Sequence, residues 1–359
     1  MADAIVHEWI SGRRGSERVF EAIAACRPDA HLHALSAAPG HGLDLGGRQL
    51  TTTFLDRRGL RERRGATLPL MSLAWRAAAG PHRYDTVVVS HHAAASQFAR
   101  FCRADRRIAY VHTPARYVWT PELDRRGASS ALTPMRALLK RADRRSADRL
   151  DAIAANSAEV AGRIERFWGR SAVVIHPPVD TVFFTPSPTA ERPSRDFLLG
   201  MSRFVPYKRL DLVIEVGERI GMPVVLAGSG PDEARLRALA ARATVPVEIV
   251  LTPSDDELRH LYRNAACLVF PAHEDFGIVP VEAQACGTPV VGVAAGGCLE
   301  TIRHGVSGIL VDGLDAGSFA DAVVSAGRLR AHACVQWAER FSLARFQSEI
   351  RPWLDGTTS

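Results

Sequence analysis

Two glutamates stand eight positions apart in the stretch HEDFGIVPVEAQACGTPVV, which covers residues 273–291. Pro280 favours a helix that begins near it, with Glu274 in the preceding loop and Glu282 in the first turn. Gly277 in that loop lets backbone amides face the hydroxyls or the phosphate of a ligand. The pattern therefore indicates a polar ligand that is bound on both sides of a helix start. The alternative is that Glu282 caps its own helix and Glu274 is a surface residue.

Two cations lie five residues apart in GMSRFVPYKRLDL: Arg203 closes an apolar run, and Lys208 lies near the start of an amphipathic one. Placed across one loop, they could bind a pyrophosphate without a metal ion. The chain has 43 arginines and only 2 lysines, so the lysine at this position hints that a compact ammonium group is needed. The alternative is a solvated basic surface.

Two glycine loops and one histidine follow apolar runs that have the character of strands. The loops contain Gly12 and Gly15 in the first half and Gly228 and Gly230 in the second, and His112 stands in YVHTP. Ligands bind at the carboxyl ends of strands in parallel sheets, and glycines allow a helix N-terminus to approach an anion. Tight structural turns and a structural histidine are the alternatives, because neither dinucleotide-binding nor P-loop spacing is present.

Several motifs of metal chemistry are absent from the sequence. It contains no Asp-x-Asp pair, no HExxH, no GxSxG and no clustered Cys and His residues. We therefore expect no metal site and no cofactor, and a diphosphate would be stabilised by Arg, Lys and helix N-termini alone.

The elements that must position these residues alternate between short apolar runs and amphipathic stretches, as in α/β proteins with parallel sheets. Six strands are expected in each half, and Ser254 and Glu257 have the spacing of a capping box at a helix start. A proline-rich stretch near residue 185 separates two Rossmann-like domains with doubly wound parallel sheets. We expect a domain of residues 1–185, completed by a terminal helix at 341–356 that crosses back to it, and a second domain of 186–340.

The net charge of +6 is unevenly distributed. Residues 1–150 contain 25 Lys and Arg against 14 Asp and Glu, and the remainder contains 20 against 25. The basic half suits a phosphate-bearing partner or an anionic membrane surface, whereas nucleic acid ranks last because aromatic residues do not interleave with the basic ones. The basic segments at 57–64 and 140–149 are candidates for membrane contact, and a solvated surface is the alternative. Six scattered cysteines and no apolar run of about 18 residues indicate a cytoplasmic chain.

Taken together, these motifs resemble the retaining glycosyltransferases of family 4, which have the two-domain GT-B fold. The resemblance rests on Glu274-x7-Glu282, SRFVPYKRLDL, LAGSGPDEARL, AANSAEVAGRI and VIHPPVDTVFF in their order along the chain. VHEWISGRRGSE, TLPLMSLAW, YDTVVVSHHAAA and YVHTPARYVW resemble the GDP-mannose-dependent mannosyltransferase branch of that family. That second match is less specific, because donor sugars change within a branch.

The resemblance implies a role for each matching residue. Arg203 and Lys208 would hold the donor pyrophosphate, and Glu282 would accept hydrogen bonds from the ribose. Glu274 would face the hydroxyls of the transferred sugar, assisted by the backbone near Phe276, Gly277, Ile278 and Val279. His112 would lie beside the sugar and the acceptor, and Gly15 would lie in the N-terminal loop that closes on the diphosphate. Gly228 and Gly230, in the second half, would lie near the nucleotide. One departure is Arg14, which replaces the first of two glycines that this family commonly has there.

The implied activity is a retaining, metal-independent transfer of a hexose, with mannose from GDP-mannose favoured, to a hydroxyl acceptor. His112, Glu274, Arg203 and Lys208 are the expected catalytic residues. A glycan, a lipid-linked glycan and a small natural product are all open as acceptors, and a peripheral position on the inner face of the membrane is one alternative for the location. A nucleotide-sugar 2-epimerase of the same fold and a non-catalytic sugar-nucleotide-binding partner are the competing hypotheses.

Overall fold

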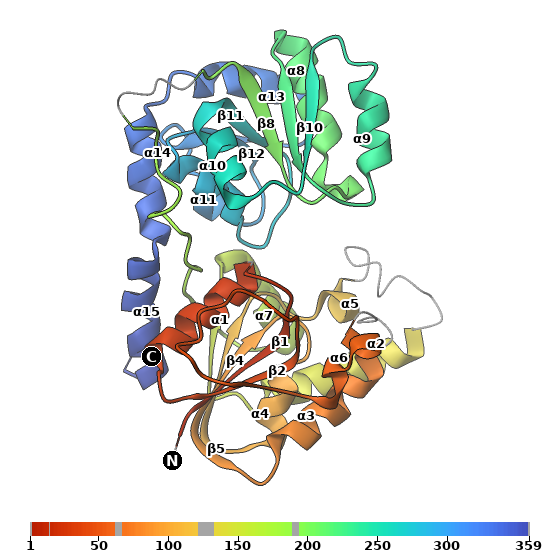
Figure 1. Cartoon of the computed structure of the whole chain (residues 1–359), viewed down its shortest axis with the longest axis vertical. Helices are drawn as coiled ribbons and strands as arrows, with labels where there is room; N and C mark the ends of the chain where they lie inside the picture. The colour runs from red at the N-terminus through yellow and green to blue at the C-terminus, as the bar shows by residue number, and fades with distance from the viewer. Residues whose placement is uncertain (1, 14, 62–66, 121–132, 189–193, 358–359) are drawn as a thin grey trace. The chain divides into compact units, whose positions relative to one another are not determined.

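The protein is described by a computed structural model that covers residues 2–13, 15–61, 67–120, 133–188 and 194–357. The chain divides into an N-terminal unit, Met1–Pro178 with Phe346–Ser359, and a C-terminal unit, Val179–Arg345. Each unit is a parallel sheet with helices on both faces, and this confirms the expected two-domain α/β fold (Figure 1). Among the described residues, no helix has the length and apolar character that a bilayer span requires.

The N-terminal sheet has seven strands in the order β3-β2-β1-β4-β5-β6-β7. All neighbouring strands are parallel. Their bounds are β1 Ala4–Ile10, β2 His31–Ala37, β3 Leu50–Thr52, β4 Arg83–His91, β5 Arg103–Val111, β6 Ala152–Ala155 and β7 Val173–Val174. The expectation of six strands was wrong here. The additional strand, β3, has three residues at the sheet edge, too few for a recognisable apolar pattern.

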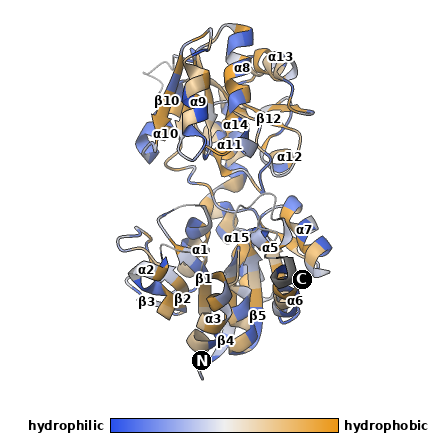
Figure 2. Ribbon diagram, turned by 90° about the vertical axis from the view of Figure 1, so that its right-hand side faces the viewer, coloured by the Kyte–Doolittle hydropathy of each residue, from blue (hydrophilic) through white to orange (hydrophobic). Residues whose placement is uncertain are grey.

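The two faces of this sheet are covered by different helices, which together make two apolar cores (Figure 1). Helices α3 Met71–Ala79, α4 Ser96–Phe101 and α7 Ala158–Trp168 pack on one face. Helix α1 Gly15–Cys26 packs on the other face beside the C-terminal part of α15 Leu343–Asp355. The shorter α2 Arg58–Arg61 and α5 Arg116–Trp119, and the basic α6 Thr133–Ala147, complete the unit. The strands of this sheet carry both hydrophobic and hydrophilic residues (Figure 2). Strand β1 is buried along its whole length, and β4 and β5 are buried toward their carboxyl ends, as expected where helices cover both faces of a sheet.

The C-terminal sheet has six parallel strands in the order β10-β9-β8-β11-β12-β13. Their bounds are β8 Phe197–Met201, β9 Val224–Gly228, β10 Val247–Leu251, β11 Ala265–Phe270, β12 Val290–Val293 and β13 Gly308–Val311. The helices are α8 Leu210–Ile220, α9 Glu233–Ala240, α10 Asp255–Asn264, α11 Ile278–Ala285, α12 Cys298–Thr301, α13 Ala316–Ala326 and α14 Ala331–Ala338. Helices α10, α11 and α14 lie over one core, and α8 and α13 lie over the other.

Two local predictions from the sequence had different outcomes. The predicted capping box is confirmed, because Ser254 accepts a hydrogen bond from the Glu257 amide and Glu257 accepts one from the Ser254 amide. The predicted helix start near Pro280 was wrong by two residues, since α11 begins at Ile278. Proline is tolerated at the third helical position because amides of the first turn have no acceptor within the helix. Glu282 consequently lies beyond the first turn and does not cap its own helix.

The units divide at residue 178, seven residues before the expected boundary. Val179 and Phe184 are buried in the core of the C-terminal unit, and the Val179 amide donates to the Phe341 carbonyl over 2.8 Å. The proline-rich stretch thus begins as part of the second core and not as a free linker.

The candidate donor and histidine sites

Each sheet has one topological switch point, where strands that lie side by side are not consecutive in the chain and their connections run in opposite directions. Polar side chains collect at this point in both sheets. Between β8 and β11 in the C-terminal unit, Arg203 follows β8 and Glu274 follows β11. Between β1 and β4 in the N-terminal unit, Glu8 lies near the end of β1 and His92 follows β4. Crevices at such switch points are where open α/β sheets bind ligands. Each unit therefore has one candidate site, described separately below.

Lys208 and Glu274 lie together in the C-terminal unit. Lys208 ends a short 3-10 helix, Pro206–Lys208, and its ammonium donates a hydrogen bond to Glu274 Oε1. The lysine is 4% exposed, and its Nζ also lies 4.8 Å from the centre of the Tyr207 ring. Arg203 is exposed and donates from Nη2 to the Tyr207 hydroxyl over 3.2 Å. The structure thus brings the two cations and one carboxylate of the sequence analysis to one loop cluster.

Gly228 and Gly230 pack against the loop that carries Arg203. A Cβ atom on Gly228 would lie 1.9 Å from the Ser202 carbonyl oxygen, and one on Gly230 would lie 2.4 Å from that of Phe204. The Phe204 amide also donates to the Ser229 carbonyl over 2.9 Å. The glycines are therefore required by the protein's own backbone, and their approach to a nucleotide stays a prediction.

Glycine residues also determine the conformation of the loop that precedes α11. Gly277 is the N-cap of this helix with φ of 92°, Phe276 is buried in the core, and Ile278 and Val279 are half-buried. The partner of this loop is Gly296-Gly297, which was not predicted from the sequence, and the Gly297 amide donates to the Glu274 carbonyl over 2.9 Å. A Cβ atom on Gly297 would lie 2.1 Å from the Phe276 carbonyl oxygen. The paired glycines before α12 were the signal for this close backbone contact.

Glu282 is held by a residue that the sequence analysis did not identify. The hydroxyl of Tyr262, on α10, donates to Glu282 Oε2 over 2.9 Å, and both side chains are buried. Burial, and then the Glu282 charge, raise the pKa of Tyr262 well above its ordinary value of 10.0, so this phenol remains a donor. Nothing in the sequence distinguishes Tyr262 from the other apolar positions of α10.

We expect Tyr262→Phe to weaken nucleotide binding about three- to tenfold, because Glu282 loses one neutral hydrogen-bond donor that fixes its carboxylate. Isothermal titration with nucleoside diphosphates measures the change in Kd. Tyr84→Phe removes a buried hydroxyl from the other unit and is the matched control. Equal affinity of Tyr262→Phe and the unmodified chain would contradict the role given to this contact.

The candidate site of the N-terminal unit is a group of histidines around Glu8. His112 follows β5 directly, is half-buried, and makes a 2.9 Å hydrogen bond from Nε2 to the Ser90 hydroxyl. Gly15 is the first residue of α1, whereas Arg14 lies outside the described residues, so its departure from the family pattern is not tested.

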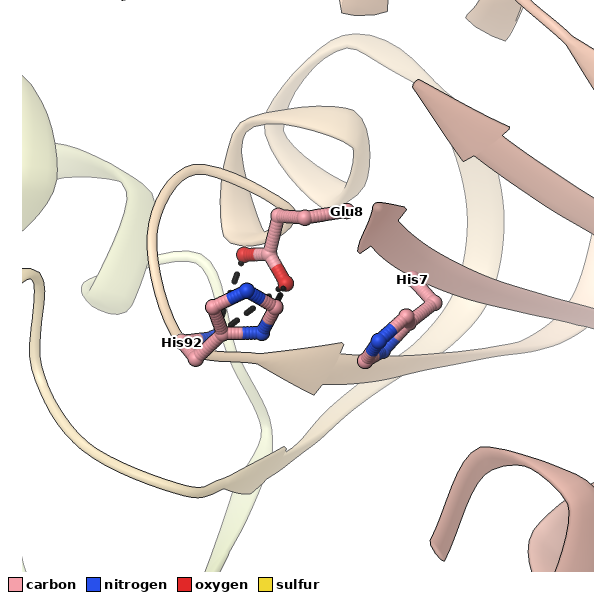
Figure 3. Close-up of side chains that lie close together, drawn as sticks. All are labelled: His7, Glu8 and His92. Atoms are coloured by element: carbon pink, nitrogen blue, oxygen red, sulfur yellow. Dashed lines mark hydrogen bonds and ion pairs between the residues drawn. The ribbon is translucent and has the colours of Figure 1, made fainter. Parts of the chain in front are cut away.

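Glu8 is a buried carboxylate with an unusual number of backbone donors. Its Oε1 accepts from the amides of residues 93, 94 and 95, each over 2.8 Å, and from the His92 amide over 3.1 Å. Nδ1 of His92 lies 2.9 Å from Oε2, close but not aligned as a hydrogen bond (Figure 3). Burial by itself would raise the pKa of Glu8, but His92, and then His91 and His7, lower it well below the ordinary value.

His7, Glu8 and His92 could in principle hold a metal ion, because one ligand atom of each lies within 4.8 Å of the others. Glu8, however, already stabilises the turn that enters α4 through the amide donors of residues 92–95. A cation bound by Glu8 would compete with these hydrogen bonds. The arrangement therefore favours Glu8 as an internal anchor of the loop after β4 over Glu8 as a metal ligand.

Two buried histidines of this unit make its stability depend on pH. Burial, followed by neighbouring histidines, lowers the pKa of His7 and that of His33 from 6.5 to about 4. The unfolded chain thus binds these protons near pH 6.5 and the folded chain only near pH 4. The free energy of unfolding is therefore unaffected by these groups above pH 6.5. It falls as the pH drops from 6.5 toward 4, by up to about 3 kcal/mol per histidine, because the unfolded chain gains protons that the folded chain does not bind.

Urea unfolding at pH 7, 5.5 and 4.5 measures this loss. We expect His33→Gln to reduce the dependence of the unfolding midpoint on pH, because one buried group with a lowered pKa is removed. His332→Asn, at an exposed position of α14, should leave the dependence unchanged. A midpoint that does not move between pH 7 and 4.5 would contradict the prediction.

Known proteins resemble both units. A family model described as Glycosyltransferase Family 4 matches residues 14–183, and one described as Glycosyl transferases group 1 matches residues 184–339. A relative from Mycobacterium sp. (strain KMS), named D-inositol 3-phosphate glycosyltransferase, is 31% identical over 282 residues. The match covers 73% of this chain and 64% of the relative. A protein of the same name from Streptomyces bingchenggensis is 36% identical over 198 residues, which cover 47% of this chain and 44% of that one.

Solved structures show the same fold at low sequence identity. The structure of Anabaena HepE in complex with UDP-glucose superposes with a TM-score of 0.72 at 20% identity, over 98% of this chain and 99% of that one. Sucrose-phosphate synthase from Thermosynechococcus elongatus gives a TM-score of 0.73 at 17% identity, with 99% of each chain covered. The match thus spans less than two thirds of the length of the mycobacterial relative, and nearly the whole length of these two structures.

Proposed function

Because the chain belongs to family 4 of the glycosyltransferases and has their GT-B fold, we propose that it transfers a hexose from a nucleotide-diphosphate sugar to a hydroxyl acceptor. The observation that carries the proposal is the contact between Lys208 and Glu274. A cation suited to the leaving diphosphate thereby lies beside a carboxylate suited to the hydroxyls of the departing sugar. Glu282, held by Tyr262, offers a second carboxylate for the ribose.

The transfer proceeds with retention and without a metal ion in this proposal. Lys208 and Arg203 stabilise the charge that develops on the diphosphate, which is the largest electrostatic demand of the reaction. No side chain is assigned as a covalent nucleophile, and the acceptor hydroxyl attacks from the face that the diphosphate leaves. His112 contacts the sugar or the acceptor.

The donor that we favour is GDP-mannose, on the resemblance of the N-terminal motifs to the mannosyltransferase branch. D-inositol 3-phosphate is the first acceptor to test, because the curated relatives carry its name. A phosphorylated acceptor also fits the basic half of the sequence, where 25 Lys and Arg stand against 14 Asp and Glu.

The test combines the purified chain with GDP-mannose, UDP-glucose and their ADP and dTDP counterparts, each with D-inositol 3-phosphate and with simple sugar acceptors. We expect release of the nucleoside diphosphate and an α-linked product by mass spectrometry and NMR, unaffected by EDTA. Conversion of the donor without any acceptor would identify an epimerase instead. Binding without turnover of any donor would identify a non-catalytic partner.

We also propose that the N-terminal unit rests on anionic lipid when its acceptor is lipid-linked. On α6, Leu138 is 69% exposed, and Arg141 and Arg145 are exposed near it, whereas Lys140 and Arg144 lie over the Trp119 ring. Part of the other basic segment, 57–64, lies outside the described residues. Sedimentation with phosphatidylglycerol vesicles at low and moderate salt tests this, and binding that is absent at low salt would remove the membrane from the proposal.

A further inference from the structure

Ser90 joins two imidazole rings in the N-terminal unit. Its hydroxyl lies 3.0 Å from His7 Nδ1 and 2.9 Å from His112 Nε2. Ser90 and His7 are completely buried. Because a hydroxyl has a single hydrogen, Ser90 donates to one ring and accepts from the other. The tautomer of His7 therefore determines that of His112.

The environment of His7 sets the direction of this relay. His7 Nε2 is buried and has no hydrogen-bond partner among the residues that the structure describes. A buried N–H group without an acceptor is rarer in proteins than a lone pair without a donor. The hydrogen of neutral His7 thus lies on Nδ1 and is donated to Ser90. Ser90 in turn donates to Nε2 of His112.

We propose that His7 and Ser90 are positioning residues that fix His112 as the Nδ1–H tautomer, so that His112 donates a hydrogen bond to a substrate oxygen. This inference rests on the proposed function, in which that oxygen belongs to the transferred sugar or to the acceptor. His112 Nδ1 has no partner among the described residues and is the ring nitrogen left for a ligand. Burial, followed by His7 and His92, lowers the pKa of His112 well below its ordinary value, which keeps the ring neutral.

The assignment limits the chemistry of His112. A neutral ring whose Nδ1 carries hydrogen, and whose Nε2 is occupied by Ser90, has no lone pair to take a proton from the acceptor hydroxyl. His112 acts as a fixed hydrogen-bond donor and not as a general base. Such a donor stabilises charge on oxygen without reorganising during the reaction.

The tautomer is measured directly by NMR of the whole chain labelled with [15N]histidine, which separates protonated from unprotonated ring nitrogens. The signals of His112 are those absent from the spectrum of His112→Gln. We expect a protonated Nδ1 and an unprotonated Nε2 in the unmodified chain. A protonated Nε2, or both nitrogens protonated at pH 7, would overturn the proposal.

Variants separate positioning from simple support of the fold. Ser90→Ala and His7→Leu should mix the two tautomers of His112 and lower kcat about tenfold or more, through the loss of one buried hydrogen bond. His7→Asn places an amide N–H where the ring Nδ1–H was and should restore both the tautomer and most of the kcat. His82→Asn, at an exposed position of the same unit, is the control for labelling and folding. An unchanged His112 spectrum in Ser90→Ala and His7→Leu would refute the relay.

The spectra require no turnover, so they remain informative if the proposed transfer is not found. The expected tautomer without any transfer would reject the proposed function and leave the relay intact. Transfer by a chain whose His112 carries hydrogen on Nε2 would reject the relay alone.

Discussion

Replacement of Lys208 by methionine is expected to lower kcat for sugar transfer about 100- to 1,000-fold, the effect of removing one preorganised donor from a developing oxyanion. The ammonium is almost fully buried against Glu274 and Tyr207, so it is held in place before the donor binds. Steady-state release of nucleoside diphosphate measures the loss. The KM for the donor should change less than kcat, because charge grows on the diphosphate as the bond to the sugar breaks.

Lys208→Met alone leaves Glu274 without its cation, which can destabilise the fold. The double variant Lys208→Met, Glu274→Gln removes both charges, so it separates a loss of activity from a loss of folding. Arg237→Ala is the matched control, since this exposed arginine of the same unit pairs only with Glu233 on α9 among the contacts described. Its activity should be unchanged. Wild-type kcat in Lys208→Met, with a melting temperature equal to that of the unmodified chain, would remove Lys208 from the mechanism.

Replacement of Glu282 by glutamine is expected to weaken nucleotide binding about 10- to 100-fold, because hydrogen bonds to a charged partner contribute about 1.5–3 kcal/mol. The effect should depend on the ribose. The unmodified chain should bind 2′-deoxy and 3′-deoxy nucleoside diphosphates less tightly than the ribonucleotides, since the buried carboxylate then gains no hydrogen bond from the missing ribose hydroxyl. Glu282→Gln should discriminate less between them.

Titration calorimetry with matched ribo- and deoxynucleotides provides the measurement. Glu257→Gln, which alters only the exposed capping box of α10, is a suitable control in the same unit. Equal discrimination by Glu282→Gln and the unmodified chain would place the ribose elsewhere, even if overall affinity fell.

The sequence was sufficient to predict the two-domain fold because apolar runs in parallel sheets are nearly continuous and the intervening helices are amphipathic. It was also sufficient for the capping box at Ser254, a purely local pattern. The start of α11 was displaced because proline is compatible with any position of the first turn. The edge strand β3 was missed because three residues carry no periodic signal.

The contacts between distant residues could not be predicted in this way. His7 and Ser90 are 83 positions apart, and Tyr262 and Glu282 are 20 apart on different helices. Periodicity places such residues on elements, but only the packing of those elements decides which side chains meet. Lys208 and Glu274 were singled out separately, from residue type and resemblance, and their direct contact emerged from the structure.

The helix α15 gives the chain an unusual order of assembly. Its residues Phe346, Ile350 and Trp353 are buried in the same core as Ile5 and Phe20 near the other end of the chain. A ribosome therefore releases the whole C-terminal unit before the N-terminal core is complete. Until then, the apolar face of the first sheet beside α1 stays uncovered. A fragment that stops at residue 178 would share this defect, and separate production of the N-terminal unit requires residues 346–355 to be joined to it by a designed connection.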